Sequence, residues 1–383
     1  MKRFFVFSII SAIILSTCCG IMPNVVYATA AEDITSKSAI LMDYGSKEVL
    51  VEKNSHDKVP VASMVKMMTI LLTVEEIEAG NLNLSDMLTT SENAAGMGGS
   101  QVFIDPYVEY SVEDMLKSVI VASANDASVA LAEHISGSEE AFVKNMNKRA
   151  KELGMEDTNY VNCTGLPAPE QFSSAYDSAI LLCEVAGHEI YHNYSTIWMQ
   201  DLIHPSGRKT GLVNTNRLVR YYEGCDGGKT GSTNEAGCCL AATAKRGDMR
   251  LISVIVGAKD SKTRFNECSS LFNYGFSNYE NVDLVSTENA LTTLGVSKGR
   301  VNSTEVFAAE KYSALVKKGE ENDYEVTYQL PSAVKAPVKA ADCVGKVLVS
   351  KSGVVVKEID VVTGQDLKAM TYLDALKKIG EKW

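Results

Sequence analysis

Residues 60–72 read Pro-Val-Ala-Ser-Met-Val-Lys-Met-Met-Thr-Ile-Leu-Leu. Pro60 suits the first turn of a helix, and almost no helix-breaking residue follows Ser63 until Gly80, so the stretch predicts a helix that begins near Ser63. On that helix the side chains of Ser63 and Lys66 lie on one face, about one turn apart. A serine nucleophile needs a nearby base, and apolar neighbours lower the pKa of a lysine enough for it to serve.

The same pattern has an ordinary explanation. Ser-x-x-Lys arises by chance in most proteins of this size, and an amphipathic helix with a surface lysine would show it. Free backbone N–H groups at the start of the helix would hold an oxyanion beside Ser63, but every helix start offers such groups. The stretch therefore needs partners elsewhere in the chain.

Length and composition indicate a folded protein with room for two domains. The chain has 383 residues, of which 45% are hydrophobic, and this argues against wholesale disorder. Its formal net charge of −11 argues against nucleic acid as a partner. The seven cysteines after residue 30 are odd in number and show no Cys-x-x-Cys spacing, which argues against a zinc knuckle or a full disulfide framework. We expect buried free thiols, with one bridge left open.

The first thirty residues differ in character from the rest. Lys2-Arg3 precedes an apolar run over residues 4–15, and Ala28-Thr29-Ala30 offers small residues at the spacing of a cleavage site. This is the pattern of a secretory signal peptide, and the apolar run is too short to span a membrane comfortably. We therefore expect residues 1–30 to be removed and the protein to work outside the cytoplasmic membrane.

A second group of polar residues interrupts a stretch that is otherwise fit for burial. Ser111, followed three residues later by Asp114, is a helix-start signature, and the helix that it opens is apolar nearly all round. This helix meets Ser123-Ala124-Asn125-Asp126, whose polar side chains are costly to bury without partners. Either these side chains cap neighbouring backbone groups, or they point into a cleft beside Ser63.

The tripeptide Lys-Thr-Gly occurs twice. Lys209-Thr210-Gly211 lies in a polar stretch where we expect a turn and no strand. Lys229-Thr230-Gly231 leads into two apolar runs, 236–244 and 251–257, and this predicts an antiparallel hairpin. A strand can present a lysine to a cleft while its backbone pairs with an extended peptide, so we assign the second copy to the site.

The remaining segments complete the architecture. Residues 38–53 read as a hairpin, and residues 282–363 hold short β-rich runs that predict a small all-β domain. An apolar stripe at helical spacing, accompanied by lysines, ends the chain at Tyr372, Leu373, Leu376, Ile379 and Trp383. Such a helix lies either on a membrane or on its own domain. We divide the chain into a signal peptide (1–30), a catalytic domain (31–281), a β-rich domain (282–364) and a C-terminal amphipathic helix (365–383).

The three motifs together are far more specific than any one of them. Ser63-x-x-Lys66, Ser123-x-Asn125 and Lys229-Thr230-Gly231, in this order on an exported chain, resemble the motifs of penicillin-recognising serine enzymes. The residues around them resemble the low-molecular-mass D-alanyl-D-alanine carboxypeptidases of bacterial cell-wall metabolism. The residues that carry this closer resemblance are 60–69, 99–101, 122–127, 214–218 and 226–233.

The resemblance implies a fold and a set of partners. It runs from about Ser38 to Tyr279 and, more loosely, over the remainder of the chain. The expected fold is an α/β catalytic domain with an antiparallel sheet covered by helices, an all-helical lobe that carries Ser123 and Asn125, and a small all-β domain behind. The implied partners are peptidoglycan stem peptides, with β-lactam antibiotics as inhibitors. No metal or organic cofactor is expected, because side chains and backbone amides meet every chemical task.

The resemblance also implies a role for each motif residue. Ser63 would attack the carbonyl between the two terminal D-alanines and become the acyl-enzyme, and Lys66 would take its proton. Ser123 would pass a proton to the leaving amine, and Asn125 would hold the substrate amide. Lys229 would supply positive potential and keep Lys66 neutral.

The substrate-binding residues implied by the resemblance are Thr230, Gly231, Ser232 and Arg264. Thr230 and Arg264 would grip the terminal carboxylate, and the backbone amides of Ser63 and Ser232 would form the oxyanion hole. Many relatives carry a bulky aromatic residue or histidine where Ser232 stands, and leucine or isoleucine in place of Gly228. These departures leave the chemistry intact and put the rate and the affinity for penicillin in doubt.

Several rival functions are open to test. His188-Glu189-x-x-His192 spells the motif of zinc proteases, which requires both histidines on one regular helix, but Gly187 and Asn193 leave room for a short helix at most. A β-lactamase shares the three motifs but needs a further glutamate to hydrolyse its acyl-enzyme, and Glu189 with Asn193 is the one candidate pair. Nitrocefin turnover would decide this case.

Three further alternatives remain, of which the first is the closest to the main hypothesis. A related endopeptidase would cut peptide crosslinks instead of stem termini. A non-catalytic wall-binding protein, whose site is no longer active, would not become labelled covalently by penicillin. A Ser-His-Asp hydrolase would need a Gly-x-Ser-x-Gly elbow, and the sequence has none.

Overall fold

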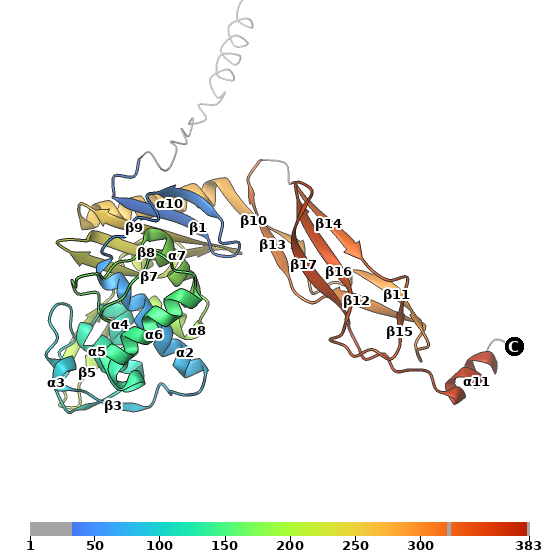
Figure 1. Ribbon diagram of the computed structural model, residues 1–383, viewed down its shortest axis with the longest axis horizontal. Coiled ribbons are helices and arrows are strands. Elements are labelled where there is room, and N and C mark those ends of the chain that lie inside the picture. The colour runs from blue at the N-terminus through green and yellow to red at the C-terminus, as the bar shows by residue number, and fades with distance from the viewer. Residues whose placement is uncertain (1–32, 320–322, 381–383) are drawn as a thin grey trace, which may run out of the picture.

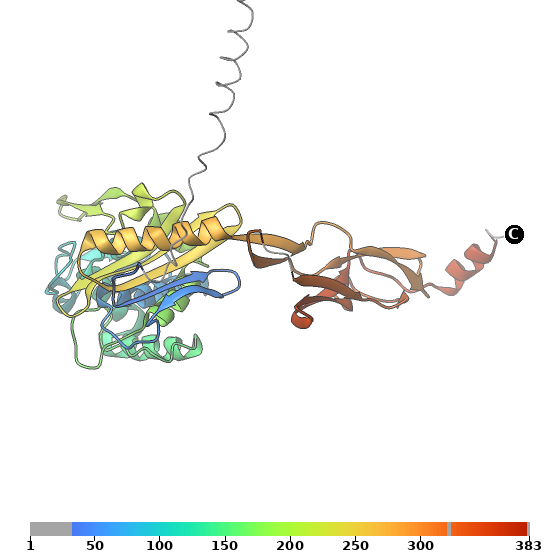
Figure 2. The same ribbon diagram turned by 90° about the horizontal axis from the view of Figure 1, so that it is seen from above.

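The computed structural model describes residues 33–319 and 323–380. The expected signal peptide lies outside the described residues. The described chain has an N-terminal part, in which helices surround a sheet, and an elongated β part that leads to a short C-terminal helix (Figures 1 and 2). This is the predicted combination of an α/β fold with a small all-β domain.

The N-terminal part is built on a five-stranded antiparallel sheet in the order β2-β1-β9-β8-β7. Its strands are β1 (Ser38–Asp43), β2 (Val49–Lys53), β7 (Cys225–Thr233), β8 (Gly237–Arg246) and β9 (Met249–Ala258). The hairpin predicted over residues 38–53 and the one predicted after Lys229 are both present. Pairing of β1 with β9 joins them into one sheet.

Both faces of this sheet are covered, and for that reason every residue of β1 is buried. Side chains alternate between faces along a strand, so Ile40 packs in the core beneath the helical layer while Leu41 packs beneath α10 (Ser261–Asn278). α10 lies along the sheet (Figure 2), and its Leu271 and Phe272 fill that second core. β7 is the edge strand on which Lys229 lies.

The opposite face carries the helical lobe. Its helices are α2 (Lys66–Glu78), α3 (Glu92–Ala95), α4 (Val112–Ala122), α5 (Asn125–Ser136), α6 (Glu139–Glu152), α7 (Ala175–Val185) and α8 (Glu189–Ser195). The short elements between them are β3 (Met87–Thr89), β4 (Glu109–Ser111), β5 (Met199–Ile203), β6 (Lys209–Val213) and α9 (Leu218–Tyr221). As predicted, Ser111 caps α4, and its Oγ accepts a hydrogen bond of 3.1 Å from the backbone N–H of Asp114.

Two local expectations need correction. Ser63 lies in a 3-10 turn (Ala62–Val65), and the α-helix begins only at Lys66. Ala62, directly before Ser63, has a φ of 49°, in the left-handed region, which excludes it from a regular α-helix. Lys209-Thr210-Gly211 was expected in a turn but lies in β6, paired with β5. Burial of Leu212 on the inner face of this hairpin accounts for the strand.

The C-terminal part consists of two sheets and a helix. β10 (Tyr279–Val285) follows α10 directly and pairs with β13 (Tyr312–Lys317). A six-stranded sheet has the order β14-β16-β17-β12-β11-β15. Its strands are β11 (Thr292–Ser297), β12 (Ser303–Ala308), β14 (Tyr324–Gln329), β15 (Ala333–Lys335), β16 (Cys343–Lys351) and β17 (Val354–Thr363). α11 (Tyr372–Gly380) lies at the far end (Figure 1).

The cysteines and the terminal helix were both subjects of sequence predictions. All seven cysteines of the described chain are free thiols, and five are buried. On α11, Tyr372 and Leu373 are 79% and 70% exposed. Within residues 33–319 and 323–380, no helix combines the length and apolar character that crossing a membrane requires.

Candidate active site

The predicted nucleophile and base are in contact. The Nζ of Lys66 donates a hydrogen bond of 3.0 Å to the Oγ of Ser63 and another of 2.5 Å to the carbonyl oxygen of Thr164. Lys66 is completely buried, and burial lowers its pKa to about 7. A substantial fraction of Lys66 is therefore neutral at neutral pH, and the neutral amine can accept the proton of Ser63.

Two glycines press against the turn that carries the nucleophile. A Cβ atom added at Gly165 would lie 2.1 Å from the carbonyl oxygen of Ala62 and 2.9 Å from the backbone nitrogen of Ser63. A Cβ atom at Gly231 would lie 2.6 Å from the carbonyl oxygen of Val61 and 3.0 Å from the same nitrogen. Only glycine permits such an approach of backbone to backbone. Strand β7 and the Gly165 loop thus fix the position of Ser63 from two sides.

Ser123 and Asn125 lie at the junction between α4 and α5. Ser123 ends α4 with a φ of 62°, in the left-handed region, and its Oγ accepts a hydrogen bond of 2.6 Å from the Nζ of Lys229. Asn125 begins α5, and its Nδ2 donates to the carbonyl oxygen of Gly98 at 2.7 Å. The Oδ1 of Asn125 is buried and has no hydrogen-bond partner within the described chain. Such an acceptor is costly to leave unpaired and suits a substrate N–H.

Lys229 is a second buried amine. It is 1% exposed on β7, and burial, together with the cations Lys66 and Arg264, lowers its pKa well below the usual value. The expected role of Lys229 was to supply positive charge, whereas burial in the free enzyme disfavours the charged form of its amine. The first copy of the tripeptide lies elsewhere, with Lys209 exposed on β6.

Arg264 lies on α10 and is hydrogen-bonded to the edge of the sheet. Its Nη1 donates to the carbonyl oxygens of Gly231 and Cys239 at 3.0 and 3.1 Å, and its guanidinium carbon lies 4.8 Å from the ring centroid of Phe265. Its Nε is buried and has no partner in the described part of the chain. Arg264 therefore supports β7 through one nitrogen while the guanidinium borders the cavity described next.

One cavity of about 500 Å³ is lined by residues of all three motifs, although Asn125 is not among its lining residues. The predicted residues that line it are Ser63, Ser123, Thr230, Gly231, Ser232 and Arg264. Lys66 and Lys229 are buried behind two of these residues. The Nζ of Lys66 contacts Ser63, and the Nζ of Lys229 contacts Ser123.

Sequence reasoning missed several residues at this cavity. The additional lining residues are Ser100, Trp198, Val213, Asn214, Thr215, Arg217, Ser261 and Phe265. The segment 214–218 contributed to the resemblance, but nothing in its sequence indicated a place at the site. Thr164 was also missed. It contributes a backbone carbonyl, and a backbone group carries no signal in residue type.

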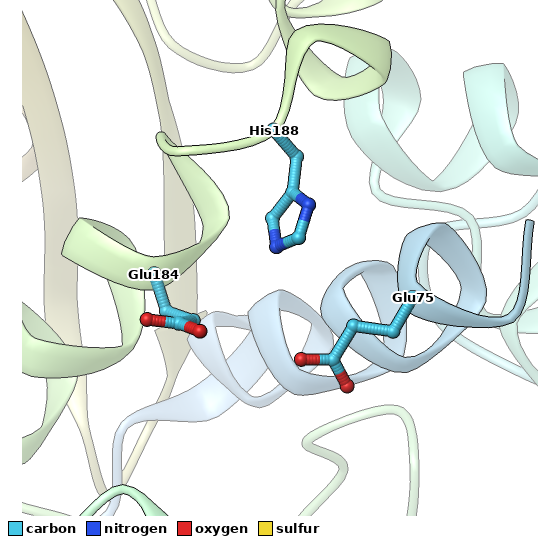
Figure 3. A group of neighbouring side chains, drawn as sticks. All are labelled: Glu75, Glu184 and His188. Atoms are coloured by element: carbon cyan, nitrogen blue, oxygen red, sulfur yellow. The ribbon is translucent and has the colours of Figure 1, made fainter. Parts of the chain in front are cut away.

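The zinc-protease motif does not form a metal centre of the expected kind. His188 precedes α8 as its N-cap, while His192 lies within the helix and its Nε2 is 2.9 Å from the carbonyl oxygen of Ala186. His188 instead neighbours Glu75 and Glu184 (Figure 3), a trio of ligand-type groups within 4.8 Å of one another.

That trio is already part of an ion-pair network. The Nη2 of Arg149 lies 2.8 Å from Glu75 and 2.9 Å from Glu184, and the Nδ1 of His188 lies 2.8 Å from Glu78. Because one guanidinium contacts both carboxylates, the cluster is an ion-pair network that links α2, α6 and α7. Glu189, the candidate glutamate of a β-lactamase, is exposed on α8.

Comparison with known proteins settles the family. Residues 25–260 match the model of a family described as D-alanyl-D-alanine carboxypeptidase (peptidase S11). D-alanyl-D-alanine carboxypeptidase DacF of Bacillus subtilis is 41% identical over 349 residues, which cover 91% of this chain and 90% of DacF. The chain belongs to the D-alanyl-D-alanine carboxypeptidase family. Within this family it is a low-molecular-mass penicillin-binding protein, since residues 279–369 match the C-terminal domain of penicillin-binding protein 5.

Solved structures of the family share the fold. Penicillin-binding protein 5 from Haemophilus influenzae superposes with a TM-score of 0.72 at 32% identity, covering 88% of this chain and 98% of that one. The ampicillin-bound form of penicillin-binding protein D2 from Listeria monocytogenes covers 64% of this chain and 98% of its own, with a TM-score of 0.57 at 29% identity. The predicted fold class is thereby confirmed.

Proposed function

We propose that Ser63 is the nucleophile through which this chain removes the terminal D-alanine from peptidoglycan stem pentapeptides. The chain is a serine-type D-alanyl-D-alanine carboxypeptidase of cell-wall synthesis, as its family and its 41% identity with DacF indicate. The observation that carries the choice of nucleophile is the 3.0 Å contact between Lys66 Nζ and Ser63 Oγ. It supplies a base of lowered pKa beside an alcohol.

The acylation step follows from this pair. Neutral Lys66 takes the proton of Ser63 while Oγ bonds to the carbonyl carbon between the two D-alanines. The oxygen of that carbonyl becomes an oxyanion, which the backbone N–H groups of Ser63 and Ser232 would stabilise. Close approach of Gly231 to the Ser63 turn supports this arrangement, because it brings the β7 backbone beside the nucleophile.

The leaving D-alanine needs a proton and a site for its carboxylate. Ser123 would relay the proton, since its hydroxyl contacts the Nζ of Lys229. Asn125 would accept the amide N–H of the peptide through its unpaired Oδ1. The carboxylate would lie against Thr230 and Arg264, and its negative charge would favour the ammonium form of Lys229. Substrate binding would thus restore the positive charge that burial disfavours in the free enzyme.

Water completes the reaction by hydrolysing the Ser63 ester. A β-lactam would enter the same route and stop at the ester, and the ampicillin-bound relative supports this expectation. The test is the intact mass of the protein after brief exposure to penicillin. We expect one adduct on the wild-type chain and none on Ser63→Ala, followed by release of D-alanine from a pentapeptide stem by the wild type alone. An adduct on Ser63→Ala would overturn the assignment.

We also propose where the enzyme acts. Its family acts on peptidoglycan, which lies outside the cytoplasmic membrane, and the signal-like residues 1–30 support export. α11 would rest on the membrane surface, because Tyr372 and Leu373 expose a large apolar area with nearby lysines. Co-sedimentation with anionic lipid vesicles tests this, and unchanged binding of Leu373→Asp would refute it.

A further inference from the structure

Strand β7 is an edge strand, and side chains of a helix cover part of its free edge. The sheet order ends at β7, so backbone groups that point away from β8 have no partner strand. The backbone N–H of Gly228 is such a group, and it donates a hydrogen bond of 2.7 Å to the hydroxyl of Tyr191 on α8. The carbonyl oxygen of Asp226 accepts one of 2.5 Å from the Oγ of Ser195 on the same helix. Helix α8 therefore occupies the edge over Asp226 and Gly228.

The same edge continues into the catalytic cavity. Residues whose backbone groups point outward alternate along an antiparallel strand with residues that bond to the neighbouring strand. Pairing of β7 with β8 shows no register shift from Gly227 to the end of the strand, so the alternation is unbroken there. The backbone groups of Thr230 and Ser232 therefore share the edge with Gly228, and both residues line the cavity. The edge that the proposed reaction uses thus begins directly after the part that α8 covers.

Tyr191 fits closely against the strand. Its side chain is 2% exposed, and a Cβ atom added at Gly227 would lie 2.6 Å from its hydroxyl oxygen. A side chain at position 227 would therefore push the hydroxyl away from the strand. Removing the hydroxyl instead would leave the N–H of Gly228 without the partner that holds it.

We propose that Tyr191 is a positioning residue for the reaction: its hydroxyl fixes the β7 edge at Gly228 and so holds the amine of Lys229 against Ser123. The inference rests on the proposed function, in which Ser123 passes a proton to the leaving amine. Lys229 directly follows Gly228, so one peptide bond carries a shift of the Gly228 backbone to it. The contact from the Nζ of Lys229 to the Oγ of Ser123 spans 2.6 Å and tolerates little displacement before the hydrogen bond weakens.

This role gives a use to the segment that resembles a zinc-protease motif. Tyr191 is the fourth residue of His188-Glu189-Ile190-Tyr191-His192. On α8 it lies four residues before Ser195, and that spacing places the two side chains on one face of the helix. Both side chains hydrogen-bond the β7 backbone. The segment thus serves the catalytic strand through its tyrosine and serine.

The experiment measures acylation of the purified full-length protein by penicillin, followed by intact mass over a range of penicillin concentrations. Tyr191→Phe keeps the ring and removes only the hydroxyl. We expect it to lower the limiting rate of acylation about tenfold and to leave the half-saturating concentration within about twofold, because Ser123 acts in the bond-breaking step. Gly227→Ala disturbs the same contact from the strand side and should lower the limiting rate by a similar factor.

Tyr194→Phe is the matched control. Tyr194 also lies on α8, and its hydroxyl donates a hydrogen bond of 3.1 Å to the carboxylate of Glu113 on α4. The same atom is removed from the same helix, but the β7 edge keeps its partner. We expect Tyr194→Phe to acylate at the wild-type limiting rate. All three variants should keep a cooperative unfolding transition in urea.

The outcomes separate this inference from the proposed function. A limiting rate of Tyr191→Phe within about twofold of the wild type would overturn the inference and leave the proposed function intact. Equal losses in Tyr191→Phe and Tyr194→Phe, or a loss confined to the half-saturating concentration, would contradict an action through Ser123. If Tyr191→Phe lacks a cooperative transition, Gly227→Ala decides in its place. Absence of an adduct on the wild-type chain would overturn the proposed function and the inference with it.

Discussion

Replacing Gly165 by alanine should disable the nucleophile without touching a catalytic side chain. The new Cβ atom would lie 2.1 Å from the carbonyl oxygen of Ala62, whereas ordinary contact begins at about 3.4 Å, so the Ser63 turn or the Gly165 loop must move by more than about 1 Å. A displacement of that size at a reacting group costs about 100-fold in rate, or about 2.7 kcal/mol of transition-state stabilisation. Gly165 also has a φ of +79°, which adds a cost of about 1–2 kcal/mol to folding.

Gly154→Ala separates the two effects. Gly154 has a φ of +73°, and no heavy atom of the described chain lies within 4 Å of its Cβ position. We expect it to lose the same stability in urea unfolding while it retains the wild-type rate of acylation by penicillin, measured by intact mass. Gly165→Ala should retain a cooperative unfolding transition and acylate about 100-fold more slowly. Acylation of Gly165→Ala within about twofold of the wild type would refute the view that this contact positions Ser63.

Three further predictions concern the base, the substrate amide and the core. Burial lowers the pKa of Lys66 to about 7, and the neutral amine is the active form, so the rate of acylation should rise with pH and level off above pH 7. Lys66→Ala should lower the rate of acylation about 10²–10⁴-fold. A rate that falls as the pH rises through 7 would contradict a neutral base. Asn125→Ala removes the unpaired buried acceptor and should lower kcat/KM for a pentapeptide by about 10–100-fold, and an unchanged kcat/KM would exclude a substrate contact. Phe272→Ala leaves a cavity in the core beneath α10 and should lower the free energy of unfolding, measured in urea, by about 3–5 kcal/mol. Ser270→Ala, on the exposed side of the same helix, should change it little.

Local patterns in the sequence determined a large part of this protein. The hairpin over residues 38–53, the cap at Ser111 and the two strands after Lys229 all depend on spacings of a few residues, and each is present. Local preferences failed where the surroundings outweighed them. A polar stretch around Lys209 became a strand because Leu212 is buried. Ala62 adopts a left-handed conformation, and a 3-10 turn over Ala62–Val65 precedes the α-helix that begins at Lys66.

The catalytic geometry could not be read from the sequence, because it depends on contacts between distant segments. The amine of Lys66 meets a carbonyl 98 residues further along the chain, and that of Lys229 meets Ser123 across 106 residues. Backbone groups such as the carbonyl of Thr164 carry no signal in residue type, and the pKa of a lysine depends on how completely the fold excludes water around it.

The sequence by itself thus predicted which residues form the candidate site and which segments carry them, since motif spacing and periodicity are properties of a single segment. Only the tertiary structure decided that Lys229 contacts Ser123, that His188 lies outside α8, and that the carbonyl oxygen of Thr164 accepts a hydrogen bond from Lys66. The physical reason is that packing brings together groups from many segments. Burial and close backbone approach, which tune those groups, exist only once the chain has folded.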